Sequence, residues 1–152
     1  MAVLAALLTE EQRVFIEARR VAHLATADGD GLPHVVPVCF AVHGDKIFSA
    51  VDEKPKTTAA RRLKRVRNIL AHPAVAIVFD RYDDNWARLG WVMAWGRAEL
   101  IENGLEHDWA VTRLRTRYPQ YRAMALHALP VIAIKIERLK SWGDLDERHG
   151  VA

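Results

Sequence analysis

The most chemically distinctive part of the sequence is a cationic segment. Seven cations fall within fourteen residues: Lys54, Lys56, Arg61, Arg62, Lys64, Arg65 and Arg67. No acidic residue follows them until Asp80. On a helix, like charges three or four residues apart destabilise by ~0.2–0.5 kcal/mol per pair. A bound anion would offset this repulsion, so the segment predicts a phosphate site.

The start of this segment is where we expect the phosphate. Lys54 and Lys56 precede a helix whose first residues we place at Thr57 or Thr58, where a threonine oxygen can cap free N–H groups. The N-terminus of a helix also favours an anion through its dipole and its unpaired N–H groups. We therefore expect Lys54 and Lys56 to be the principal phosphate ligands. The alternative interpretation is a solvated cationic face that keeps the protein soluble.

Other chemistries have little support in the sequence. There are two serines and no G-x-S-x-G motif, and the seven histidines show no H-E-x-x-H or Cys/His spacing, so we expect neither a serine hydrolase nor a metal site. Glycine-rich nucleotide motifs are also missing. The catalytic residues are unknown from the sequence. The single cysteine, Cys39, lies in an apolar run and is expected to be a buried, inert thiol.

The composition limits the possible domain architecture and the possible binding partners. With 152 residues, of which 51% are hydrophobic, the chain is expected to form one domain over 1–152. The net charge of +3 is modest, so a nucleic-acid partner is not expected. The N-terminal MAVLAALL is too short for a membrane span and lacks the cationic start of a signal peptide. A lone cysteine fits a reducing compartment, so we expect a cytoplasmic protein.

The elements that must position these residues follow from periodicity and turn residues. We expect a helix from Thr9, with a Thr9/Gln12 capping box, to about Arg20. The remaining expected elements are strands at Val21–Ala27, Pro33–Val42 and Lys46–Val51, the cationic helix ending before Pro73, strands at Val75–Tyr82 and Arg88–Ile101, a helical region at Gly104–Leu129 broken at Pro119, and a strand at Val131–Leu139. This order does not alternate as in a doubly wound fold. It favours a mainly β, α+β fold: an antiparallel barrel with flanking helices.

Three of these elements have informative side-chain patterns. The strand at Pro33–Val42 is apolar at nearly every position, so both of its faces are expected to be covered. In the fifth strand, large Trp91, Met93 and Trp95 alternate with small residues, which suits contact with a second subunit on one face. In the cationic helix, we expect Ala59, Leu63, Val66 and Leu70 on the buried side and Arg61, Lys64, Arg65 and Asn68 on the other.

Several runs of residues, taken in order, resemble one known family. The runs are Ala22-His23-Leu24-Ala25-Thr26, Gly31 to Phe40, Val51 to Lys56, Arg67-Asn68-Ile69, His72 to Val75, and Trp91-Val92 with Gly96-Arg97-Ala98. Over about Val21 to Trp142 the chain resembles the pyridoxamine-phosphate-oxidase-like split β-barrel proteins. Within them it is most similar to the branch that uses the deazaflavin coenzyme F420.

The resemblance implies a homodimer with two cofactors, each in a groove between the subunits. The strand Val36-Pro37-Val38 and the strand end Ser49-Ala50-Val51 would border the ring system. Lys54, Lys56 and Thr57 at the start of the cationic helix would hold the phosphate, with Arg61 and Asn68 as further candidates. Trp91 or Trp86 would border the pocket from the facing subunit. Independently of the family, Pro37 lacks an N–H and therefore indicates a strand edge or bulge where a ligand can approach.

The resemblance also implies a function. We expect an F420-dependent oxidoreductase that transfers a hydride between the deazaflavin and an unsaturated organic substrate. FMN is the alternative cofactor, because a lysine pair suits the phosphate of either. A protein that binds F420 without turnover is the non-enzymatic alternative. The chain is shorter than the enzyme that gives the family its name and has no C-terminal arginine and histidine motif that would bind pyridoxamine phosphate. This argues against oxidation of that vitamin.

Overall fold

The computed structural model describes residues 7–51 and 63–150. The described strands form one sheet in the order β2-β1-β5-β6-β7-β4-β3, and every neighbouring pair is antiparallel. The strands are β1 (Ala22–Ala27), β2 (Pro33–Val38), β3 (Ala41–His43), β4 (Lys46–Ala50), β5 (Ala74–Arg81), β6 (Gly90–Ile101) and β7 (Val131–Gly143). The helices are α1 (Glu10–Glu17), α2 (Lys64–Ala71) and α3 (Leu105–Arg117), with short 3-10 segments η2 (Trp86–Arg88), η3 (Pro119–Ala123), η4 (Leu126–Ala128) and η5 (Glu147–Gly150).

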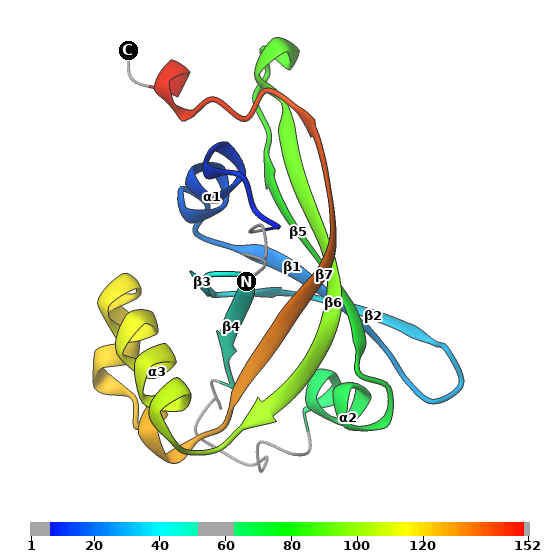
Figure 1. Cartoon of the computed structure of the whole chain (residues 1–152), viewed down its shortest axis with the longest axis vertical. Coiled ribbons are helices and arrows are strands. Elements are labelled where there is room, and N and C mark those ends of the chain that lie inside the picture. The colour runs from blue at the N-terminus through cyan, green and yellow to red at the C-terminus, as the bar shows by residue number, and fades with distance from the viewer. Residues whose placement is uncertain (1–6, 52–62, 151–152) are drawn as a thin grey trace, which may run out of the picture.

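The sheet curls into a half-barrel with the helices around it, as Figure 1 shows. The predicted fold class, a mainly β antiparallel split barrel with flanking helices, is therefore confirmed. The curl follows partly from a register shift between Trp95 and Gly96 on the long pair β6–β7. A Cβ atom at Gly96 would lie 2.1 Å from the carbonyl oxygen of Lys135. Only glycine allows the two strands to approach this closely.

Two hydrophobic clusters hold the helices on the sheet. The larger cluster fills the inside of the barrel, where Phe15 and Ile16 of α1 and Val66 and Ile69 of α2 pack with side chains from β1, β4, β5, β6 and β7. The second cluster joins α3 to β4 and β7. The Thr9/Gln12 capping box that begins α1 is present as predicted. No helix within residues 7–51 and 63–150 is long and apolar enough to cross a membrane.

The expected strand at Pro33–Val42 is wrong, because this run forms two strands at opposite edges of the sheet. The chain leaves β2 at Cys39 and enters β3 at Ala41. Between them, the backbone of Phe40 bonds to the Tyr118 hydroxyl, with Phe40 N–H donating over 3.1 Å. As an edge strand, β2 is also not covered on both faces within the described residues, since Val35 is 64% exposed.

The described part of the cationic helix differs from expectation in its start and its orientation. Helix α2 begins at Lys64, with Leu63 in an extended conformation before it and without a side-chain cap. The expected start at Thr57 or Thr58 lies outside the described residues. The buried side contains Asn68 and Ile69, whereas Leu70 is 54% exposed. The helix is therefore rotated by about one residue relative to the prediction.

Two other boundaries also moved. Helix α1 ends at Glu17, and not at about Arg20. Strand β7 continues to Gly143, four residues beyond the predicted end at Leu139, because its last residues pair with β6 as far as Gly90.

The alternation along β6 is confirmed. Val92, Ala94 and Gly96 are buried inside the barrel, whereas Trp91, Met93 and Trp95 are half-buried on the outer face. Trp91 stacks on its cross-strand partner Trp142, with ring centroids 6.5 Å apart. We call these four large side chains, Trp91, Met93, Trp95 and Trp142, the aromatic face. No described helix is part of it.

Candidate functional site

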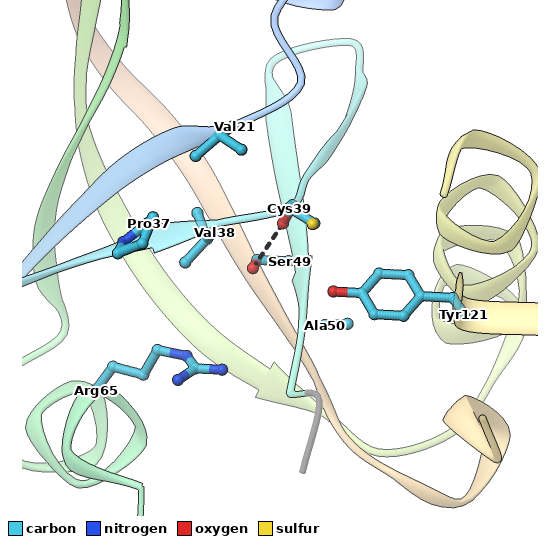
Figure 2. Close-up of a pocket in the computed structure, with 8 residues that line it drawn as sticks. All are labelled: Val21, Pro37, Val38, Cys39, Ser49, Ala50, Arg65 and Tyr121. Carbon is cyan, nitrogen blue, oxygen red and sulfur yellow. Dashed lines mark hydrogen bonds between the residues drawn. The ribbon is translucent and has the colours of Figure 1, made fainter. Parts of the chain in front are cut away.

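A pocket of about 200 Å³ opens where the ends of β2 and β4 meet the first turn of α2 (Figure 2). Of the described residues, eight line it: Val21, Pro37, Val38, Cys39, Ser49, Ala50, Arg65 and Tyr121. They come from segments far apart in the sequence, which the barrel brings together. We take this pocket as the candidate functional site.

Two strand ends form the largely apolar side of the pocket. Pro37 and Val38 end β2, and Ser49 and Ala50 end β4. The Ser49 hydroxyl donates a hydrogen bond of 2.9 Å to the carbonyl oxygen of Cys39, which ties the two strand ends together (Figure 2). The Ser49 hydroxyl proton is therefore used within the protein, and this side of the pocket suits an apolar ring.

Arg65 supplies the positive charge of the pocket. It is the second residue of α2, and its guanidinium extends toward the end of β4 in Figure 2. A guanidinium presents several N–H donors in a fixed plane and suits carboxylate or phosphate oxygens. Its place at the beginning of a helix adds the favourable end of the helix dipole. An anionic group on a ligand would be held at this side of the pocket.

The position of α2 is fixed by two contacts with β1 and the turn that follows it. Asn68 donates a 2.9 Å hydrogen bond to the Thr26 hydroxyl, and both side chains are buried. Lys64 lies 3.7 Å from a carboxylate oxygen of Asp28. Hydrogen bonds from the backbone N–H groups of Leu32 and Asp30 lower the pKa of Asp28 below its usual value, and Lys64 adds to this effect.

Tyr121 closes the pocket from the side of the α3 region. It lies on η3, its side chain is 4% exposed, and its ring packs edge-on against Tyr118 with centroids 5.7 Å apart. Figure 2 shows its hydroxyl pointing toward Ala50 at the end of β4. The pocket thus has a guanidinium and a phenol at different positions on its wall.

The structure brings together four of the residues predicted to border a cofactor ring: Pro37, Val38, Ser49 and Ala50. Their two neighbours do not line the pocket: Val51 is buried in the core and Val36 packs against it. The predicted ligands Lys54, Lys56, Thr57 and Arg61 lie outside the described residues. The described chain nevertheless stops at Val51 and resumes at Leu63, close in sequence to the pocket residues Ala50 and Arg65.

Two other predicted residues lie elsewhere. Asn68 faces Thr26 in the interior and does not line the pocket, because α2 is rotated relative to the prediction. Trp91 lies on the aromatic face, away from the pocket of its own chain. Its predicted contact with a cofactor held by a facing subunit stays a prediction.

The sequence analysis missed four lining residues: Val21, Cys39, Arg65 and Tyr121. Cys39 was expected to be buried and inert, yet it is only partly buried and lines the pocket, because the chain bends there between β2 and β3. Arg65 was noted within the cationic cluster, but the predicted helix start at Thr57 or Thr58 did not show that Arg65 lies in the first turn of α2. Tyr121 gave no local signal, since its contact with the pocket depends on the tertiary fold.

The lining side chains indicate binding more than acid–base chemistry. Among the described lining residues there is no carboxylate and no imidazole. Within residues 7–51 and 63–150 there is also no group of three or more His, Cys, Asp or Glu side chains placed to hold a metal ion. The pocket therefore suits a ligand with an apolar body and an anionic substituent.

Comparisons with known proteins identify the fold. The family model described as pyridoxamine 5'-phosphate oxidase matches residues 8–143. A search of curated proteins gave no match. Among solved structures, the conserved hypothetical protein Rv2991 from Mycobacterium tuberculosis superposes with a TM-score of 0.71 at 21% identity, covering 100% of this chain and 94% of that one.

Two further solved structures have different ligands in their descriptions. A FAD-binding protein from Mesorhizobium loti has a TM-score of 0.65 and 24% identity, with 88% of this chain and 94% of that chain covered. HutZ, described as the heme storage protein from Vibrio cholerae, has a TM-score of 0.70 and 17% identity, with 90% and 94% covered. At these identities the likeness shows the shared fold.

Proposed function

We propose, because this chain belongs to the pyridoxamine 5'-phosphate oxidase family, that it is an oxidoreductase that binds coenzyme F420 in the pocket between β2, β4 and α2. The reduced cofactor would transfer a hydride to an unsaturated organic substrate. One observation carries the proposal: the ends of β2 and β4 and the guanidinium of Arg65 line one pocket. Two of these lining residues, Ala50 and Arg65, flank in sequence the segment that holds Lys54 and Lys56.

The residues at the pocket fit such a cofactor. Pro37, Val38 and Ala50 offer an apolar wall for the deazaflavin ring, and Arg65 suits its phosphate. Lys54 and Lys56, with Thr57 and Arg61, would complete the phosphate site. When bound, the cofactor supplies the hydride, and the protein orients the ring and excludes water. The chain therefore needs no acid–base pair of its own for hydride transfer.

The size of the pocket supports a homodimer. At about 200 Å³ it is smaller than the ~300–1,000 Å³ of typical ligand sites. A ring system held there would remain partly exposed unless a second surface covered it. The aromatic face offers large side chains without a described helix over them, and within it Trp91 stacks on Trp142. In the proposed dimer this face of each subunit, with Trp91 or Trp86, borders the groove of the other.

FMN is the second candidate cofactor. It combines an apolar ring with a terminal phosphate, so Arg65 and the lysine pair would suit it as they suit F420. The Mesorhizobium loti neighbour, which is described as FAD-binding, supports a flavin in this fold. Carriage of the cofactor without turnover is the non-enzymatic candidate, because the short chain has no evident substrate-reading residues.

The test is a fluorescence titration of the purified protein with F420 and with FMN. We expect saturable binding of F420, weakened about tenfold or more in Lys54→Ala/Lys56→Ala, because charge-assisted hydrogen bonds contribute ~1.5–3 kcal/mol. Arg97→Ala/Lys135→Ala is the matched control, since it removes two exposed cations paired across β6 and β7. It should leave the affinity unchanged.

The outcomes separate the candidates. Tighter binding of FMN than of F420 would identify FMN as the cofactor and would leave the proposed binding site unchanged. Cofactor binding without oxidation across a panel of enones and quinones would indicate a carrier. The absence of saturable binding of either cofactor, or an equal loss in both double variants, would contradict the proposal.

A further inference from the structure

A second cationic segment lies in and after α3, and the proposed function does not use it. Between Asp108 and Glu137 the sequence holds no acidic residue. The same stretch contains five cations: Arg113, Arg115, Arg117, Arg122 and Lys135. Like charges three or four residues apart destabilise a helix. The segment therefore favours contact with a negative group.

The arginines of this segment differ in what the fold already does with them. Arg117 donates a hydrogen bond of 2.8 Å to the carbonyl oxygen of Glu17, which ties α3 to the end of α1. Arg113 lies over an aromatic ring of its own helix. Arg115 and Arg122 form no ion pair with an acidic residue in the described part of the chain. No described carboxylate therefore balances the charge of these two arginines.

Arg115 and Arg122 line one pocket of about 290 Å³ at the end of α3. Its other described lining residues are Thr112 and Thr116. Because Thr112, Arg115 and Thr116 are three and four residues apart, they share one face of α3, and Arg122 reaches the pocket from η3. The pocket shares no described lining residue with the candidate functional site. It is therefore a separate place for a ligand.

Hydrogen bonds hold the two guanidinium groups at this pocket. Arg115 Nη2 donates to the carbonyl oxygen of Arg122, and Arg122 Nε donates to the carbonyl oxygen of Arg115, each over 3.3 Å. Arg115 Nη1 lies 3.4 Å from His127 Nε2. The Nε atom of Arg115 is buried and has no hydrogen-bond partner among the described residues. Because a guanidinium has five N–H donors, these contacts position both arginines and leave donors of each for a ligand.

The number of charges and donors indicates the kind of ligand. A guanidinium suits two oxygens of a carboxylate or a phosphate. A phosphate monoester carries nearly two negative charges at neutral pH and three acceptor oxygens, so it can bind both arginines at once and balance both charges. A carboxylate balances only one of them. The pocket therefore matches a phosphate monoester better than a carboxylate.

We infer that the pocket lined by Thr112, Arg115, Thr116 and Arg122 binds a phosphate monoester group, with the two guanidinium groups donating to its oxygens. This site is distinct from the proposed cofactor site, and the inference does not rest on the proposed function. A small metabolite and the headgroup of phosphatidic acid share this chemistry. The experiment below distinguishes these two sources.

The test is a titration with phenyl phosphate followed through the NMR signal of the His127 ring. This ring lies beside Arg115, so its signal reports on this pocket and not on a phosphate bound near α2. The signal is assigned through its loss in His127→Gln. At about pH 7.5 we expect a saturable shift of this signal in the wild type, and an affinity about tenfold lower in Arg122→Gln.

Arg113→Gln is the matched control. Arg113 and Arg122 are both exposed, and each substitution removes one positive charge, but Arg113 does not line the pocket. We therefore expect Arg113→Gln to change the affinity for phenyl phosphate by less than about twofold.

A second measurement uses the wild-type protein and does not depend on the folding of an arginine variant. Benzoate presents one carboxylate on the same ring as phenyl phosphate. Because it balances one charge and not two, we expect its affinity, measured through the His127 signal, to be at least about tenfold lower.

Cosedimentation with vesicles identifies the source of the phosphate monoester. Phosphatidylcholine vesicles with about 20% phosphatidic acid are compared with phosphatidylcholine alone. Binding that needs phosphatidic acid and is lost in Arg122→Gln, but not in Arg113→Gln, would support the site and assign it to a lipid headgroup. Binding of phenyl phosphate without cosedimentation would support the site and assign it to a small metabolite.

Three results would overturn the inference. They are a His127 signal that phenyl phosphate does not shift, an equal loss of affinity in Arg122→Gln and Arg113→Gln, and benzoate binding as tight as that of phenyl phosphate. None of them bears on the binding of F420 or FMN, which is measured separately.

Discussion

The side-chain amide of Asn68 donates a hydrogen bond of 2.9 Å to the hydroxyl of Thr26, and both side chains are buried. This bond joins α2 to β1 in the interior. Arg65 lies three residues before Asn68 on the same short helix. Asn68 was predicted as a phosphate candidate, and the structure instead gives it a role in fixing the helix that presents Arg65 to the pocket.

Replacing Asn68 should therefore affect both stability and binding. In Asn68→Ala, the buried Thr26 hydroxyl loses its partner, which costs about 1–3 kcal/mol in the free energy of unfolding. Urea denaturation measures this loss, and cofactor affinity should fall with it because α2 is less firmly placed. Asn103→Ala, at an exposed position after β6, should change the unfolding free energy by less than about 0.5 kcal/mol. Equal effects of the two substitutions would contradict the assigned role.

Local sequence signals predicted most elements of the fold. The capping box of Thr9 and Gln12, the alternation along β6 and the helix break at Pro119 each depend on residues close together in the chain. The end of β2, in contrast, depends on a residue far away in the chain. The Tyr118 hydroxyl, which lies 78 residues from Phe40 in sequence, bonds to the Phe40 backbone. The sequence does not show that contact, and the apolar run therefore resembles one continuous strand.

The same distinction applies to the candidate site. Pro37, Val38, Ser49 and Ala50 were predictable because they lie at strand ends within the runs that resemble the family. Tyr121 was not predictable, since it reaches the pocket only after α3 has packed on β4 and β7. The prediction of the buried face of α2 was also wrong, because helical periodicity does not show that the polar Asn68 has a hydrogen-bond partner in the interior.

Gly96 tests the cause of the curl in the sheet. In Gly96→Ala, the new methyl group would lie 2.1 Å from the Lys135 carbonyl oxygen, so β6 and β7 must separate. We expect a loss of about 3 kcal/mol or more in the free energy of unfolding. In Gly29→Ala no atom lies within 4 Å of the new methyl group, so the change should be small. Urea denaturation of both variants decides the point, and a near-neutral Gly96→Ala would show that the bulge tolerates a side chain.

The proposed dimer predicts a response to charge on the aromatic face. Met93 lies half-buried between Trp91 and Trp95, so Met93→Lys would place a cation within the interface. Sedimentation velocity should give the mass of a dimer for the wild type and of a monomer for this variant. Leu105→Lys, at a position 89% exposed on α3, is the control and should remain dimeric. A monomeric wild type, or a dimeric Met93→Lys, would argue against an interface at this face.

Asp28 predicts a specific pH dependence of stability. Its pKa is lowered in the folded protein, chiefly by the hydrogen bond from the Leu32 backbone N–H. The ionised form therefore stabilises the fold above the unfolded-state pKa of about 4, and this contribution is lost as the pH falls below that value. The difference in unfolding free energy between the wild type and Asp28→Asn should accordingly shrink from pH 7 toward about pH 3. Urea denaturation across this pH range measures this difference, and Asp84→Asn, at an exposed position, is the control. A difference between wild type and Asp28→Asn that stays constant with pH would be evidence against this role of Asp28.

The most direct test of the proposed cofactor site is the affinity of Arg65→Met for F420 and for its phosphate-free riboside core. Methionine keeps much of the apolar length of the side chain and removes the guanidinium that lines the pocket. If Arg65 holds the phosphate, the affinity for F420 falls about tenfold or more, while the affinity for the core changes by less than about twofold. An equal loss for both ligands, or no loss for F420, would contradict a phosphate site at the beginning of α2.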